Sequence, residues 1–222
     1  MTEPTLAEAS APGPSLDRVE VRNLFPTPVA VTSLPGAAAL NAALKTTILE
    51  HEQSHASTQH SNLGGWQSRW DFAEWSGAAG RQVLESARAL ATQLTSNRQG
   101  QAVRVDWKMN AWANINRHGQ GNEFHTHPGS FWSGSYYVDD GSASAGQDVG
   151  GEFEIQDPRG VAPAMYAPAL TVAGRAGTAM GAVEMLRPRA GMMILFPAWL
   201  QHAVRPYRGT TQRISIAFNL SV

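Results

Sequence analysis

The sequence predicts a mainly β protein with flanking helices (α+β), folded as a jelly roll. Residues 103–117 and 213–219 alternate apolar and polar side chains, which is typical of strands that bury one face. Residues 37–55 and 76–96 instead repeat apolar side chains about every 3.6 residues, which indicates two amphipathic helices. These patterns together predict a β-sheet core with helices packed on its outside.

Length and composition limit the domain organisation. The 222 residues suffice for one core, so we expect a single domain over residues 19–222. Residues 1–18 hold almost no large apolar side chains, and we expect them to form a disordered tail. The segment 160–181, rich in Ala, Pro and Gly, is predicted to be a lid or insert beside the functional site.

Charge and cysteine content exclude several classes of function. The net charge is −1, and no run of Lys or Arg marks a nucleic-acid or membrane surface. The absence of Cys excludes disulfides, zinc-thiolate sites and cysteine nucleophiles, so a metal here needs N or O ligands. No apolar stretch approaches the ~20 residues of a membrane span, and we expect a soluble cytoplasmic protein.

The remaining strands and loops are read from the same periodicities. The loop at 62–75 carries Trp66 and Trp70, which we expect to be packing anchors that could also stack on a ligand beside a cleft. Within 103–117 the asparagine face could line a polar cavity or meet water; we favour the cavity, with Asn114 as a cofactor-binding candidate. Further short strands are predicted at 19–25, 29–31, 131–138, 151–155, 183–186 and 192–196.

The strongest chemical signal is the pair His125 and His127, just before Pro128-Gly129. Side chains at i and i+2 of a strand point to the same face, so two imidazoles would share one space. Neutral imidazole is a good ligand for iron, zinc, copper or nickel. A lone histidine is more simply explained as a hydrogen-bonded core residue, but the same-face pair favours a metal site.

A third ligand and an anion-binding residue are predicted near the C-terminus. His202 follows the apolar run 192–196, and 77 residues separate it from His125, which leaves room for several strands. The strand at 213–219 then places Arg213 and Ser215 on the face opposite Ile214 and Ile216. An arginine on the inward face of a strand indicates an anionic ligand.

Taken in order, these fragments resemble one enzyme family. The stretch His125-Thr126-His127-Pro128-Gly129-Ser130, the run Ser133-Gly134-Ser135-Tyr136-Tyr137-Val138, Asp157-Pro158-Arg159, Phe196-Pro197 before His202, and Arg213 with Ser215 are similar to the 2-oxoglutarate and Fe(II)-dependent oxygenases, in the branch of the prolyl hydroxylases. The resemblance runs from about residue 20 to the C-terminus. It implies a double-stranded β-helix and an Fe(II)/2-oxoglutarate-dependent dioxygenase.

The resemblance also implies residue roles. His125, His127 and His202 would bind Fe(II) as the catalytic centre, and Arg213 would hold the distal carboxylate of the cosubstrate 2-oxoglutarate with help from Ser215 and Tyr137. Hydroxylation with release of succinate and CO2 is the implied outcome. The substrate would be a small molecule or a peptide, with no nucleic acid or membrane as partner, and a homodimer is compatible with the sequence.

One feature departs from the family pattern, because His127 stands where most of these enzymes carry Asp or Glu. One of the pair could therefore lie outside the metal shell, with Glu123, Glu152 or water in its place. Two other readings stay open: a cupin-type three-histidine dioxygenase or isomerase without 2-oxoglutarate, in which Arg213 holds the substrate's own carboxylate, and a non-catalytic jelly-roll binding protein with structural histidines.

Overall fold

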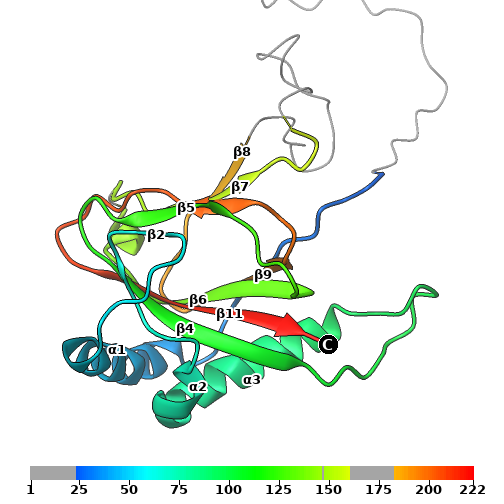
Figure 1. Ribbon diagram of the computed structural model, residues 1–222, viewed down its shortest axis with the longest axis horizontal. Coiled ribbons are helices and arrows are strands. Elements are labelled where there is room, and N and C mark those ends of the chain that lie inside the picture. The colour runs from blue at the N-terminus through cyan, green and yellow to red at the C-terminus, as the bar shows by residue number, and fades with distance from the viewer. Residues whose placement is uncertain (1–23, 147, 161–182) are drawn as a thin grey trace, which may run out of the picture.

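Two antiparallel β-sheets lie face to face in the computed structural model, which describes residues 24–146, 148–160 and 183–222 (Figure 1). The six-stranded sheet has the order β1-β9-β6-β11-β4-β3, and the five-stranded sheet has the order β2-β5-β10-β7-β8. Helices cover the outer face of the six-stranded sheet (Figure 1). This arrangement confirms the predicted mainly β jelly roll with flanking helices.

The element bounds follow the sequence patterns with local differences. The helices are α1 (Ala37–Ser54), the short α2 (Phe72–Trp75) and α3 (Gly77–Gln93), of which α2 falls inside a predicted loop. The six-stranded sheet contains β1 (Ala30–Ser33), β9 (Met192–Pro197), β6 (Trp132–Asp140), β11 (Arg213–Ser221), β4 (Lys108–Asn116) and β3 (Trp66–Gln67). The other sheet contains β2 (Asn62–Leu63), β5 (Gly121–His125), β10 (His202–Val204), β7 (Phe153–Gln156) and β8 (Val183–Leu186).

Some sequence predictions lie outside the described residues or differ from them. The tail at 1–18, most of the strand at 19–25 and nearly all of the insert at 160–181 fall outside the described residues. Leu24 and Phe25, the described end of that first strand, are not part of a strand. The strand predicted from residue 103 begins only at Lys108. The division into a tail and one domain stays a prediction.

The main hydrophobic core lies between the helices and the six-stranded sheet. Helix α1 contributes Leu44 and Ile48, and the alternating strand β11 contributes Ile216 and Phe218, all without solvent exposure. Because successive strand residues face opposite sides, the other residues of β11 point between the two sheets. A smaller apolar cluster lies in that inner space: Tyr137, Phe153, Ile155, Ile194, Phe196 and Leu200. Polar side chains, among them His202, Arg213 and Ser215, are also buried there, and the functional site lies among them.

None of the helices in the described ranges is long and apolar enough to cross a bilayer.

Candidate metal and cosubstrate site

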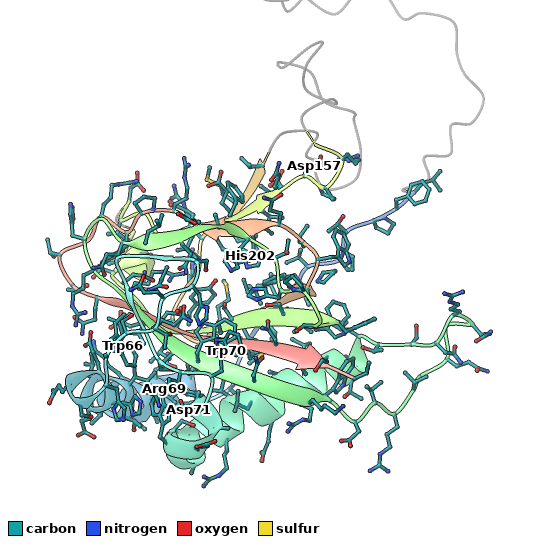
Figure 2. The ribbon with its side chains drawn as sticks, in the orientation of Figure 1. Trp66, Arg69, Trp70, Asp71, Asp157 and His202 are labelled. Carbon is teal, nitrogen blue, oxygen red and sulfur yellow. The ribbon has the colours of Figure 1, made fainter. Side chains whose placement is uncertain are left out.

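Three histidines converge between the sheets. His125 is the last residue of β5 and His202 the first of β10, and the two are direct partners in the antiparallel register. His127 lies two residues beyond β5, where its main-chain N–H donates to the carbonyl of Ala198 at 2.9 Å. One potential ligand atom from each of the three rings lies within 4.8 Å of the other two. Figure 2 labels His202 in the space between the sheets.

The prediction that both His125 and His127 belong to one strand is wrong for His127. The chain turns at Pro128 and Gly129, the glycine has a φ of +84°, and the Ser130 N–H donates to the carbonyl of His127 at 3.3 Å. A strand cannot continue into this turn, so β5 ends at His125. The two rings nevertheless reach the same space, which is what a shared metal site requires.

Hydrogen bonds fix which nitrogens can bind a metal. Nδ1 of His125 is 2.7 Å from the carbonyl of Glu123, and Nδ1 of His202 is 2.8 Å from the carbonyl of Leu200. Because a carbonyl only accepts, each Nδ1 carries the proton and each Nε2 keeps a free lone pair when the ring is neutral. Nε2 of His127 and Nε2 of His202 are 3.3 Å apart. Two nitrogens at about 2.1 Å from one ion lie about 3.0–3.4 Å apart at octahedral or tetrahedral angles, so this spacing fits a common metal.

Burial keeps these rings neutral. Loss of water around the rings, with the neighbouring imidazoles as a smaller cause, lowers the pKa of His127 to about 4 and that of His202 to about 3; the hydrogen bond to Leu200 opposes the shift in His202. Burial likewise lowers the pKa of His125, opposed by the hydrogen bond to Glu123. A metal binds the neutral imidazole, so at neutral pH the three ligands need lose no proton.

The facing wall belongs to β4, β11 and β6. Ser215 of β11 is in register with Asn114 on one side and Tyr137 on the other, so three polar side chains form a row across three strands. All three residues are buried, with 8% or less of their surface exposed. The predicted polar cavity is therefore present, and Asn114 lines it.

Arg213 is the first residue of β11, two residues before Ser215 and on the same face, and it is in register with Asn116 of β4. It is 3% exposed, its Nη1 donates to Oδ1 of Asn116 at 3.2 Å, and its guanidinium carbon lies 5.1 Å from the centroid of the Tyr137 ring. Burial lowers the pKa of Arg213, opposed chiefly by Tyr137, and burial raises the pKa of Tyr137 to about 12. The site thus holds a buried cation beside a neutral phenol, a pair suited to bind a carboxylate.

All seven predicted site residues line one pocket, together with residues that the sequence patterns did not single out as site residues. Ser61 Oγ is 3.5 Å from Nε2 of His125, and the ring of Trp112 is 5.9 Å from that of His127. Ser61 could not be found from the sequence because it lies in a polar loop with no local signal. The lining comprises Ser61, Trp112, Asn114, Asn122, His125, His127, Ser133, Gly134, Ser135, Tyr137, Phe153, Phe196, His202, Val204, Arg213, Ser215 and Ala217.

No carboxylate among the described residues joins the three histidines. The side chain of Glu123 is exposed, although its carbonyl orients His125. Glu152 lies in a neighbouring pocket, where an oxygen of its carboxylate is 3.9 Å from Arg187. Neither glutamate therefore lies where it could replace one of the histidines as a metal ligand.

Together, the paired antiparallel sheets, the inward-facing histidines and the buried arginine define a double-stranded β-helix with a candidate metal site. Residues 110–219 match the model of the family described as putative 2OG-Fe(II) oxygenase. Through this match the chain is identified as an Fe(II)- and 2-oxoglutarate-dependent dioxygenase. Neither the cupin-type alternative nor the non-catalytic binding protein is favoured by this result.

Solved structures share the fold at low sequence identity. A prolyl-4-hydroxylase of Pseudomonas putida is 15% identical with a TM-score of 0.60, covering 88% of this chain and 92% of its own. A Trichoplax adhaerens prolyl hydroxylase, solved with a peptide of the hypoxia inducible factor oxygen degradation domain, is 15% identical with a TM-score of 0.59 and coverage of 87% and 83%. HygX of Streptomyces hygroscopicus, solved with nickel, 2-oxoglutarate and hygromycin B, is 10% identical with a TM-score of 0.54 and coverage of 88% and 83%. No curated protein matches the chain significantly.

Proposed function

We propose that this chain hydroxylates a small-molecule or peptide substrate, with His125, His127 and His202 as the iron ligands. The observation that carries the proposal is the convergence of three neutral imidazoles on a pocket whose opposite wall holds Arg213. Bound iron supplies the redox chemistry in which O2 oxidises 2-oxoglutarate to succinate and CO2 and one oxygen atom enters a substrate C–H bond.

The chain's own residues bind and orient the cosubstrate. Arg213 holds the distal carboxylate through its two-pronged guanidinium, and the hydroxyl groups of Ser215 and Tyr137 donate further hydrogen bonds. The Tyr137 hydroxyl keeps its proton at neutral pH because burial raises its pKa to about 12. Asn114, in the same row, offers an amide to the same ligand.

Trp70 and Trp112 make a substrate surface beside the metal ligands. Trp112 is 7% exposed, lines the pocket and tilts against Trp70 at 6.1 Å between ring centroids. Trp70 is 54% exposed, whereas Trp66 is buried as a packing anchor. Ser68 exchanges hydrogen bonds with Ala113 of β4, which fixes the segment that carries Trp70. An exposed aromatic ring on a fixed segment beside a pocket is suited to contact a substrate.

The structural neighbours do not choose between the two substrate classes. The Trichoplax enzyme was solved with a peptide and HygX with hygromycin B, and likeness at this level of identity concerns the fold. A peptide and a small molecule both remain within the proposal. The cytoplasmic location and a homodimer likewise stay predictions from the sequence.

Metal binding and cosubstrate consumption test the proposal. We expect one Fe(II) per chain by elemental analysis after anaerobic loading, and slow, iron-dependent formation of succinate from 2-oxoglutarate without added substrate. His202→Ala should lower metal affinity at least about tenfold through loss of a ligand. His118→Ala is the matched control, because His118 is exposed and outside the pocket. Equal metal binding by both variants would refute the role of His202.

A further inference from the structure

Among the residues that the structure describes, the ligand set of the proposed metal site carries no negative charge of its own. The three histidines form the group, and no Asp or Glu of the described ranges belongs to it. The internal segment 161–182, which lies outside those ranges, contains no acidic residue in its sequence. Metal-bound imidazoles are neutral, so a divalent ion at this site keeps its full charge of +2.

The surroundings of the site make that charge costly. His202 is 3% exposed, and its ring lies 4.6 Å from the ring of Phe196 and 5.0 Å from that of Phe153. An uncompensated charge in surroundings that exclude water is strongly unfavourable. A metal alone is therefore expected to bind weakly here, unless an anion accompanies it.

The other end of the pocket also favours an anion. Arg213 is buried there, and the charges that face it are those of Asp140 and Glu152, which partly balance the guanidinium. Neither carboxylate lines the pocket that holds the histidines. A ligand with two carboxylates can place one at the metal and the other at Arg213, and so bring a negative charge to the pocket side of both cations.

We propose that the pocket takes up the metal and the dicarboxylate as a pair, each binding weakly without the other, and that His127 determines this dependence. This inference rests on the proposed function, since it assumes that His127 is an iron ligand. An aspartate at position 127 would bring a negative charge to the metal and make metal binding less dependent on the cosubstrate. Thermodynamic linkage requires the effect to be reciprocal: the factor by which 2-oxoglutarate tightens metal binding equals the factor by which the metal tightens 2-oxoglutarate binding.

Calorimetric titration with Mn(II), with and without saturating 2-oxoglutarate, measures this dependence without turnover. In the wild type we expect 2-oxoglutarate to tighten Mn(II) binding by about 100-fold, near the upper end of usual coupling between sites. His127→Asp and His127→Asn are a matched pair that differ in charge but hardly in shape. The Asp variant should bind Mn(II) alone about tenfold tighter than the Asn variant and show a coupling factor about tenfold smaller than the wild type.

The outcomes separate this inference from the proposed function. If Mn(II) binds the wild type as tightly alone as with 2-oxoglutarate, the inference is overturned, whether or not the variants fold. The same conclusion follows if the Asp and Asn variants behave alike. If the wild type binds no 2-oxoglutarate even with Mn(II) present, the proposed function itself fails. The inference and the proposed function are both supported if the wild type binds Mn(II) and 2-oxoglutarate tightly together and the Asp variant shows a smaller coupling factor.

Discussion

Replacing Arg213 tests the cosubstrate half of the site. Arg213→Lys keeps the positive charge but loses the fork that can contact both oxygens of a carboxylate. A hydrogen bond to a charged group contributes about 1.5–3 kcal/mol, and each 1.4 kcal/mol corresponds to about a tenfold change in affinity. Because Arg213 is 3% exposed, water cannot replace the lost contact. We therefore expect Arg213→Lys to weaken 2-oxoglutarate binding by about tenfold to 150-fold, and Arg213→Ala to weaken it further.

The assay is calorimetric titration of the Mn(II)-loaded chain with 2-oxoglutarate at fixed salt. Gly151 has a φ of +73°, and a Cβ there would lie 2.9 Å from Cδ of Arg213, so the local backbone is built around this side chain. Folding of each variant is therefore checked by circular dichroism, and Mn(II) binding in the presence of excess cosubstrate is checked separately. Arg104→Ala, at an exposed arginine, controls for a general charge effect. Equal 2-oxoglutarate affinity in wild type and Arg213→Ala would refute the carboxylate-binding role.

Three further predictions concern pH, packing and the substrate surface. Burial lowers the pKa of His202 to about 3 in the fold, against about 6.5 in the unfolded chain, so the unfolding free energy of the chelator-treated protein should decrease as pH falls below about 6.5. In urea denaturation, His202→Gln should reduce the slope of unfolding free energy against pH by up to about 1.4 kcal/mol per pH unit. Gly134→Ala should destabilise by about 1–3 kcal/mol, because the added Cβ would collide with the main-chain oxygen of Ile194; an unchanged urea midpoint would contradict this contact. Trp70→Ala should change stability by less than about 0.5 kcal/mol and Trp112→Ala by about 3–5 kcal/mol, and similar urea midpoints for both would contradict their different burial.

Strand periodicity was enough to place most of one wall of the site. In β11 the alternation of Ile214 and Ile216 with Arg213 and Ser215 has only two possible orientations, and the apolar residues choose the helix side. The polar residues must then face the inner space. The same logic puts Asn114 inward on the neighbouring strand. The alternation of side chains along a strand therefore predicts which residues face a site whenever the residues on the other face clearly belong to the hydrophobic core.

The other features depend on contacts that no local pattern encodes. His127 leaves the strand because of a turn, yet its ring stays in the site because its main chain bonds to Ala198, far away in sequence. Ser61 approaches His125 only because β2 pairs with β5. Asn116 meets Arg213 through the pairing of β4 with β11. These contacts follow from strand order and register, which sequence periodicity leaves open.

The two halves of the site differ in how firmly the fold supports them. Arg213, Ser215 and Tyr137 lie on long central strands whose outer face packs against the helices, so the cosubstrate wall is backed by the main core. His125 and His202 lie at the ends of the short strands β5 and β10, whose register shifts between His202 and Val204, and His127 follows just beyond β5. A bulge of this kind ends regular pairing and redirects side chains, as is common beside active sites. The proposed cosubstrate wall is thus supported chiefly by core packing and strand pairing, whereas the proposed metal ligands depend on main-chain hydrogen bonds and would gain further order from a bound ion.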